Sequence, residues 1–273
     1  MTLNELPLLV EPERLEPLLG EEKLLLVDLC KREQYDRAHI PGAVHLEYGL
    51  IVHGQRPAPG LLPPPQQLAH ALGALGLERE HHVVAYDDEG GGKAARLLWT
   101  LDVVGHPRWS LLNGGLHAWA NEHHKLSGRA EQPTPSDYPV SYGEAPVATL
   151  EWLRAHLDDP AVRVLDARTN AEYHGWKSYA TRPGHIPGAA NLDWMQTMDP
   201  NRNLRLRPEA ELRGLLEERG LTPDKQIVCH CHTHHRSSHS YVMLRTLGYP
   251  LVKGYPGSWS EWGNHPDVPI EAS

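Results

Sequence analysis

The sequence lacks phenylalanine altogether and has only three cysteines in 273 residues. Three cysteines are too few for a disulfide framework, and a chain of this length buries a sizeable core without one. It also lacks any run of about 18 consecutive apolar residues, so we expect no membrane-spanning helix. Residues 1–20 have neither the basic start nor the apolar core of a secretory signal, which predicts a soluble, cytoplasmic protein.

Positive charge is also scarce. Lysine and arginine number 26 against 35 aspartate and glutamate residues, which gives a formal net charge of -9. A chain with this balance has no general attraction for nucleic acid or an anionic membrane, so we expect neither as a partner. Any anionic substrate must therefore be bound by a local positive site.

A long-period repeat divides the chain. Residues 38–43 (Ala-His-Ile-Pro-Gly-Ala) recur as residues 184–189 (Gly-His-Ile-Pro-Gly-Ala). Further pairs follow in the same order: residues 27–28 with 165–166, 83–87 with 227–231, and 114–119 with 254–259, the last at a displacement of 140. We therefore expect two copies of one domain, residues 1–128 and 148–273, joined by a proline-rich linker at residues 129–147.

Short apolar runs alternate with helical patterns in each copy. Residues 24–27 and 83–86 predict strands in the first copy, and residues 162–165 and 226–230 predict strands in the second. An apolar stripe at helical spacing, Leu68 to Leu75, predicts a helix. This alternation predicts an α/β fold in which each copy has a mainly parallel sheet with helices on both faces. Ligands of such sheets bind outside the carboxyl ends of the strands.

The strongest chemical signal follows the predicted strand at residues 226–230. Cys231 lies at its carboxyl end, and after a short polar turn we expect a helix that continues to about Leu247. The N–H groups of the turn, the positive end of this helix and the guanidinium of Arg236 would lower the pKa of Cys231 and favour the nucleophilic thiolate. The alternative is a buried, unreactive cysteine, which is how we interpret Cys30 and Cys229.

Two other chemistries fit parts of this segment. Cys229, Cys231 and the neighbouring histidines could form a metal site, but the sequence has no second pair of ligands of the kind that structural zinc sites use. A cysteine followed by Arg-Ser also resembles the loop of cysteine phosphatases, which has five residues between the two, whereas four separate Cys231 from Arg236. The shorter loop makes a tighter ring of N–H groups, which favours transfer of a sulfur atom over phosphate chemistry.

Taken together, the order and spacing of these motifs resemble the tandem-domain rhodaneses, the thiosulfate sulfurtransferases, over essentially the whole chain. The resemblance rests on Asp28 with residues 39–43, their repeat at 166–168 and 184–189, the loop 231–237, and the glycine-rich segments before Trp119 and Trp259. The loop Cys-His-Thr-His-His-Arg-Ser is similar to a bacterial subgroup with Cys-x-Thr-His-His-Arg-Ser. It differs from the thiosulfate loop Cys-Arg-Lys-Gly-Val-Thr and the mercaptopyruvate loop Cys-Gly-Ser-Gly-Val-Thr.

The resemblance implies an enzyme that moves sulfane sulfur from thiosulfate, or a related small anionic donor, to cyanide or a thiol. The sulfur would be carried as a persulfide on Cys231 by double displacement, without a cofactor or a metal. A thioredoxin-like protein or an iron-sulfur assembly protein would suit as a thiol acceptor. The alternatives are a 3-mercaptopyruvate sulfurtransferase and a non-enzymatic module that binds a metal or a partner through the histidine-rich loop.

The predicted site residues all belong to the second copy. Cys231 and Arg236 are the predicted catalytic residues, and the predicted donor-binding residues are Thr233, His234, His235, Arg182 and Trp194. In the first copy Asp87 stands at the position of Cys231. A carboxylate cannot carry sulfane sulfur and would itself fill a ring of N–H groups, so we expect this copy to be catalytically silent.

Three further charged residues are expected to have structural roles. Asp28 and Asp166 each follow a predicted strand, where a carboxylate can accept hydrogen bonds from the N–H groups of a turn. Arg168 is expected to be the buried partner of Asp166 or of Glu172.

Overall fold

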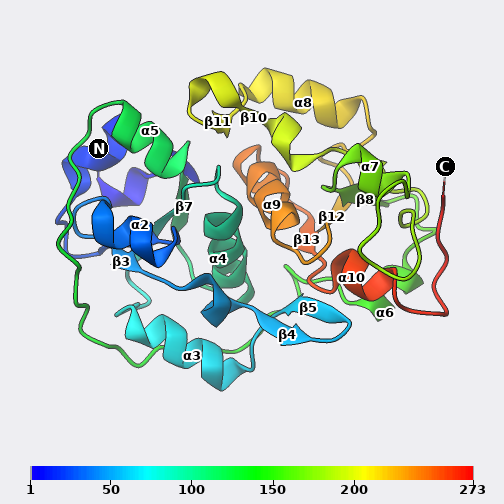
Figure 1. Cartoon of the computed structure of the whole chain (residues 1–273), viewed down its shortest axis with the longest axis horizontal. Helices are drawn as coiled ribbons and strands as arrows, with labels where there is room; N and C mark the ends of the chain where they lie inside the picture. The colour runs from blue at the N-terminus through cyan, green and yellow to red at the C-terminus, as the bar shows by residue number, and fades with distance from the viewer. Residues whose placement is uncertain (1, 273) are drawn as a thin grey trace. The chain divides into compact units, whose positions relative to one another are not determined.

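The predicted strands lie in two parallel sheets, one in each half of the repeat (Figure 1). The structure is a computed structural model and describes residues 2–272. The chain folds into two units. Unit 1 comprises the residues up to Val52, Pro63–Gly143 and Asp199–Leu206, and unit 2 comprises His53–Leu62, Glu144–Met198 and the residues from Arg207 onward. Parallel sheets combined with helices confirm the predicted α/β fold class.

The sheet of unit 1 has the strand order β1-β7-β6-β2-β3, and all its neighbouring strands are parallel. The predicted strands at residues 24–27 and 83–86 are β2 and β6. The predicted stripe from Leu68 to Leu75 is the buried side of α3 and its C-cap. The strands are β1 (Leu9–Val10), β2 (Leu24–Asp28), β3 (Val44–His45), β6 (His82–Tyr86) and β7 (Trp109–Leu112); the helices are α1 (Pro12–Leu15), α2 (Arg32–Arg37), α3 (Pro65–Ala74), α4 (Gly92–Val103) and α5 (Gly115–Asn121), with short 3-10 helices at Leu3–Glu5, Glu16–Leu18 and Tyr48–Ile51.

The sheet of unit 2 has the order β13-β12-β8-β9, again with all neighbours parallel. The predicted strands at residues 162–165 and 226–230 are β8 and β12, so β12 is an inner strand. The strands are β8 (Val162–Asp166), β9 (Ala190–Asn191), β12 (Gln226–His230) and β13 (Val252–Gly254); the helices are α6 (Leu150–Ala155), α7 (Asn170–Tyr173), α8 (Glu209–Glu217), α9 (Arg236–Thr246) and α10 (Ser258–Trp262), with a 3-10 helix, η4, at Trp194–Thr197.

Two short segments do not belong to the unit formed by the sequence on either side of them. The antiparallel hairpin of β4 (His53–Gln55) and β5 (Ala58–Leu61) is part of unit 2, where β5 packs against α10. Residues 199–206, which contain the 3-10 helix Pro200–Arg202 and β11 (Arg205–Leu206), are part of unit 1; β11 pairs with β10 (Met198–Asp199). The repeat in the sequence does not predict that either segment belongs to a different unit from its neighbours in the sequence.

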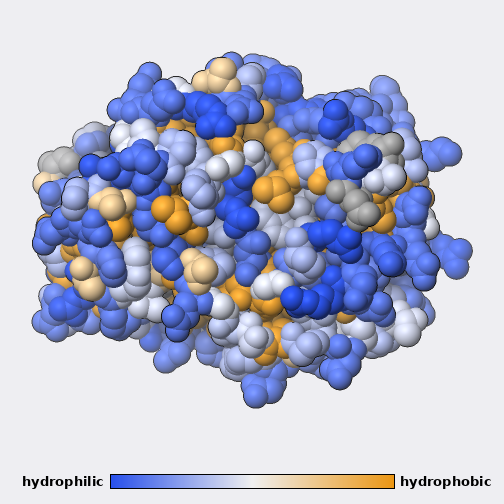
Figure 2. All heavy atoms as spheres, turned by 180° about the vertical axis from the view of Figure 1, so that it is seen from behind, coloured by the Kyte–Doolittle hydropathy of each residue, from blue (hydrophilic) through white to orange (hydrophobic). Residues whose placement is uncertain are grey.

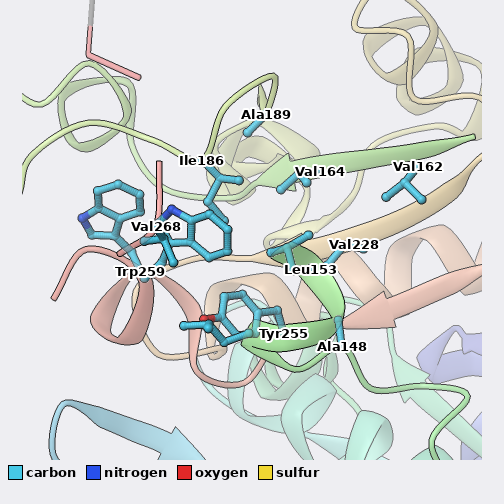
Figure 3. Close-up of a cluster of buried hydrophobic side chains, with 12 residues drawn as sticks. Ala148, Leu153, Val162, Val164, Ile186, Ala189, Val228, Tyr255, Trp259 and Val268 are labelled. Atoms are coloured by element: carbon cyan, nitrogen blue, oxygen red, sulfur yellow. The ribbon is translucent and has the colours of Figure 1, made fainter. Parts of the chain in front are cut away.

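Tryptophan and tyrosine supply the large rings of the unit 2 core, because the chain has no phenylalanine. Tyr255, Trp259 and Trp262 are at most 1% exposed and pack with aliphatic side chains of the sheet, including Val164 and Val228 (Figure 3). An aromatic side chain buries about 150–250 Å² when it is fully enclosed. These rings therefore hold the turn between β13 and α10 against the sheet, close to the end of β12.

Polar side chains cover most of one face of the protein (Figure 2). On the face drawn in Figure 2 polar residues predominate, and apolar residues form small separate groups. Within residues 2–272 every helix is too short or too polar to cross a lipid bilayer. Among the exposed large hydrophobic residues, Trp176 and Tyr179 are the most accessible, at 72% and 61%.

The structure corrects the register of the last repeat pair, for which the sequence predicts a displacement of 140. In unit 1 the Leu116 N–H donates to the carbonyl of Asp87 (2.9 Å), and in unit 2 the Trp259 N–H donates to the carbonyl of Cys231 (3.0 Å). Asp87 and Cys231 each directly follow an inner strand, so Leu116 corresponds to Trp259 and the displacement is 143. Glycine and tryptophan recur at nearby positions in both segments, and sequence matching aligned the wrong pair.

Candidate active site

The loop of residues 231–235 joins the carboxyl end of β12 to α9. As predicted, the helix reaches its C-cap at Leu247, and Gly248 follows in the left-handed conformation with φ +79°. The side chain of Cys231 is 1% exposed. An inner parallel strand therefore delivers Cys231 to the N-terminal end of an eleven-residue helix, the end that carries partial positive charge.

The surroundings of Cys231 stabilise its thiolate. Burial raises the pKa of Cys231, but the charge of Arg236 and hydrogen bonds from the Ser237 side chain and the N–H groups of Ser237 and Thr233 outweigh it. The pKa of this thiol therefore lies below its ordinary value. Arg236 and the loop N–H groups are the groups that the sequence predicts for this task; the Ser237 hydroxyl is an addition.

The other two cysteines differ from Cys231. Cys30 and Cys229 are 3% and 0% exposed, and burial raises the pKa of each thiol. All three cysteines are free. The interpretation of Cys30 and Cys229 as packing residues is confirmed, and Cys231 is the cysteine whose surroundings favour the reactive form.

Arg236 forms a bidentate ion pair with Glu172. Its two terminal nitrogens lie 2.7 and 2.8 Å from the two carboxylate oxygens, and the Glu172 side chain is only 5% exposed. Although burial opposes ionisation, Arg236 and Thr169 lower the pKa of Glu172 to about 2. Thr169 also caps α7 in a capping box with Glu172, so the carboxylate that fixes Arg236 is itself fixed.

A second buried ion pair lies behind the loop. Arg168 donates to both carboxylate oxygens of Asp166, to the carbonyl of Gly184, and stacks on the ring of Trp259 at 4.4 Å. Of the two partners that the sequence allows for Arg168, the structure selects Asp166. The N–H of Arg168 also donates to Asp166 (3.0 Å), and that of Cys30 to Asp28 (2.7 Å), which confirms that both aspartates cap turns after their strands.

Three of the predicted donor-binding residues lie around the loop. The N–H of Thr233 points to the Cys231 sulfur. His235 is half-buried, and its ring centroid lies 5.7 Å from that of Trp194 on η4 in an edge-on contact. The Thr233 N–H thus serves the sulfur itself, and the Trp194 ring packs against His235 of the same loop.

The other two predicted donor-binding residues face the interior of unit 2. His234 is 0% exposed, and its Nδ1 lies 2.8 Å from the Ser237 hydroxyl. Arg182 donates to the carbonyls of Trp262, His265 and Val268, and so ties the segment after α10 to the loop before Ile186. These side-chain contacts of His234 and Arg182 thus lie within unit 2, with Ser237 and with the three carbonyls respectively.

Sequence reasoning misses two residues that contact the loop backbone. Ser258 has φ +52°, is fully buried, and accepts a hydrogen bond from the Cys231 N–H (3.3 Å). Gly60, on β5, lies so close that an added Cβ would come within 2.1 Å of the carbonyl oxygen of Thr233. No local motif marks either residue, because both contacts join segments that are distant in the sequence.

In unit 1 a carboxylate occupies the equivalent loop. The buried Asp87 accepts hydrogen bonds from the N–H groups of Glu89 (3.0 Å), Gly91 (2.8 Å) and Ala94 (2.9 Å). Burial raises the pKa of Asp87, and these three donors oppose that rise. The prediction that Asp87 fills the ring of N–H groups is confirmed.

Within residues 2–272 no group of three or more histidine, cysteine, aspartate or glutamate side chains is arranged to hold a metal ion. His230 is fully buried, its Nε2 lies 3.5 Å from Asp166, and burial lowers the pKa of its ring to about 4.

Comparison with known proteins gives results at the level of family, relative and fold. A family model described as a rhodanese-like domain matches residues 11–122 and 149–265. The chain is 47% identical to a thiosulfate sulfurtransferase of Pseudomonas aeruginosa over 268 residues, which cover 98% of each protein. It is 32% identical to a 3-mercaptopyruvate sulfurtransferase of Escherichia coli over 243 residues, 88% of this chain and 85% of that protein.

A solved structure extends the similarity to the fold. The anaerobic ergothioneine biosynthesis enzyme from Chlorobium limicola superposes with a TM-score of 0.86 at 21% identity, over 97% of this chain and 70% of that one. At this identity the likeness concerns the fold alone.

Proposed function

Since the chain belongs to the rhodanese family, we propose that it is a thiosulfate sulfurtransferase that carries sulfane sulfur as a persulfide on Cys231. One observation carries the proposal: the Cys231 thiol is buried, yet Arg236, Ser237 and the Thr233 N–H lower its pKa. The thiolate is the nucleophilic form of cysteine, and the interactions of this loop offset the unfavourable free energy of burying its charge.

In the first half-reaction the Cys231 thiolate attacks the outer sulfur of thiosulfate. A new S–S bond forms to Cys231, the original S–S bond breaks, and sulfite leaves with its electron pair. The product is a persulfide anion, which needs the same N–H donors and the same positive charge as the thiolate did. Arg236 supplies that charge without moving, since Glu172 holds it by two hydrogen bonds.

In the second half-reaction an acceptor attacks the terminal sulfur. Cyanide takes it as thiocyanate, and the bonding pair returns to Cys231 as the thiolate, so the cycle closes without a cofactor. For the donor, the loop N–H groups, Thr233, His235 and the ring of Trp194 provide the binding surface. His234 and Arg182 use their side chains within unit 2 in the free protein.

A thiol-bearing protein is a second kind of acceptor, either thioredoxin-like or engaged in iron-sulfur assembly. Trp176 and Tyr179 are strongly exposed, and the ring centroid of Tyr179 lies 5.6 Å from that of His232, the residue after Cys231. Exposed aromatic side chains are frequent anchors of protein interfaces. The position of Tyr179 beside the loop supports a macromolecular acceptor in addition to cyanide.

In this proposal one domain reacts and the other does not. The N-terminal domain, residues 1–128, is catalytically silent because Asp87 already occupies its N–H ring, and the C-terminal domain, residues 148–273, is catalytic. The enzyme acts in the cytoplasm, where free cysteines such as these three persist in reduced form.

The proposal is tested by thiocyanate formation with varied donor and cyanide. Double displacement predicts parallel lines in double-reciprocal plots and a higher kcat/KM for thiosulfate than for 3-mercaptopyruvate. The reverse donor preference would favour the 3-mercaptopyruvate alternative, whose E. coli representative is the more distant relative. No sulfur transfer from either donor would refute the proposal.

A further inference from the structure

His234 contacts the thiolate-stabilising Ser237 from a fully buried position. Its ring is 0% exposed, and its Nδ1 lies 2.8 Å from the Ser237 Oγ. Its backbone has φ +57°, in the left-handed region that non-glycine residues rarely adopt and that costs conformational free energy. A buried histidine held in such a conformation beside a nucleophile indicates a specific task.

The hydroxyl of Ser237 has only one proton to donate. Ser237 forms a side-chain hydrogen bond to the Cys231 sulfur, and a thiolate can only accept. When the Ser237 hydroxyl donates its proton to the sulfur, the contact with His234 is a hydrogen bond that the Ser237 oxygen accepts. This requires a proton on Nδ1 of His234. The opposite tautomer, with a bare Nδ1, would draw the hydroxyl proton away from the sulfur.

We propose that His234 is a positioning residue that carries a proton on Nδ1 and holds the Ser237 hydroxyl as a hydrogen-bond donor to Cys231. The two hydrogen bonds run in one direction, from Nδ1–H to Oγ and from O–H to the sulfur, so each polarises the next. This task replaces the donor-binding role that the sequence predicts for His234. The inference rests on the proposed function, because it concerns the nucleophile of that reaction.

The variants described below leave the other ionisable groups near Cys231 in place. These groups are Arg236 on α9, Glu172 on α7, Asp166 and Arg168 at the end of β8, Cys229 and His230 on β12, and His232 and His235 in the loop. A change in the titration of Cys231 then reports the hydrogen-bond chain. A merely structural role of His234 would change stability without such a change in titration.

The test is the pH dependence of the rate at which iodoacetamide alkylates Cys231, measured for the wild type, S237A, H234G and S237A/H234G. S237A and H234G are each expected to raise the midpoint by about one pH unit, the loss expected for one charge-assisted hydrogen bond. Because His234 acts through Ser237, the double variant is expected to match S237A. An unshifted midpoint in H234G, or an equal additional shift when H234G is combined with S237A, would overturn the proposal.

Two further variants separate this task from backbone effects. H234N tolerates the left-handed conformation and offers an amide N–H near the position of Nδ1, so it is expected to retain a midpoint lower than that of H234G. H123G is the matched control, because His123 is an exposed histidine of unit 1 with φ +65°, and its midpoint is expected to equal that of the wild type. H234N behaving like H234G, or a shift in H123G, would contradict the assignment.

Sulfur loading from thiosulfate, recorded on the same samples, distinguishes the two levels of the account. Wild-type protein that takes up no sulfur would refute the proposed function. Wild-type protein that loads sulfur, while H234G shows no shift of the midpoint, would refute only the role of His234.

Discussion

Replacement of Arg236 by glutamine tests the ion pair that fixes the active loop. Glu172 is 5% exposed, and its pKa lies at about 2 compared with an ordinary value of 4.5. That difference of about 2.5 pKa units corresponds to about 3 kcal/mol at 1.36 kcal/mol per unit. That shift is the joint effect of Arg236 and Thr169 against burial. Removal of the charged partner of a buried carboxylate costs about 3–5 kcal/mol, so R236Q is expected to lower the free energy of unfolding by about 3 kcal/mol at pH 7.

The same ion pair predicts that the free energy of unfolding depends on pH. A carboxylate whose pKa is lower in the folded protein stabilises it fully above the unfolded pKa of about 4.5 and loses this effect as the pH falls through 2. The stability difference between wild type and R236Q should therefore be largest at neutral pH and shrink between pH 4.5 and 2. Urea unfolding at pH 7 and at pH 3, followed by tryptophan fluorescence, measures it.

Two controls accompany R236Q. R207Q removes the exposed pair between Arg207 and Glu211 (3.3 Å), which is expected to be worth less than about 1 kcal/mol. R236Q/E172Q leaves no unpaired charge and is expected to be more stable than R236Q alone. Equal unfolding curves for wild type and R236Q at pH 7, or a difference that persists unchanged at pH 3, would refute the assigned strength of this pair.

Two other predictions concern the loops of the two units. D87A removes the acceptor of three buried N–H groups, which costs about 1–3 kcal/mol for each group left without a partner. Thermal unfolding should therefore shift to lower temperature, while sulfur loading of Cys231 stays unchanged. A loss of loading in folded D87A would contradict the silent role of unit 1. G60A forces a Cβ to within 2.1 Å of the Thr233 carbonyl and is expected to slow loading at least about tenfold, whereas G54A, on the same hairpin with nothing within 4 Å, should load like the wild type. Equal stopped-flow loading rates for G60A and G54A would refute the contact.

The local features of the fold can be predicted from the sequence. The strand at residues 226–230, the cysteine at its end and the helix C-cap at Leu247 each follow from short-range patterns, and the structure places them where the patterns do. The repeat identifies Asp87 as the counterpart of Cys231, because strands and loops recur in the same order. These features depend on neighbours in the sequence, which a single chain records directly.

The tertiary contacts of the site cannot be predicted in the same way. Glu172 precedes Arg236 by 64 positions, and the sequence offers Arg168 as an equally reasonable partner for it. Gly60 lies in the N-terminal half of the chain, yet it touches the loop in unit 2. Two sequence patterns do mark this region: the Thr-x-x-Glu capping box at residues 169–172 and Ser237 directly after Arg236. Neither pattern indicates which groups the Glu172 carboxylate and the Ser237 hydroxyl contact.

The central claim, that Cys231 carries the transferred sulfur, is tested most directly by the intact mass of the protein after incubation with thiosulfate. The wild type is expected to gain one sulfur atom, located by peptide mapping to Cys231 and removed by cyanide as thiocyanate, while C231S gains none. Sulfur uptake by C231S, or location of the sulfur at Cys30 or Cys229, would contradict the account.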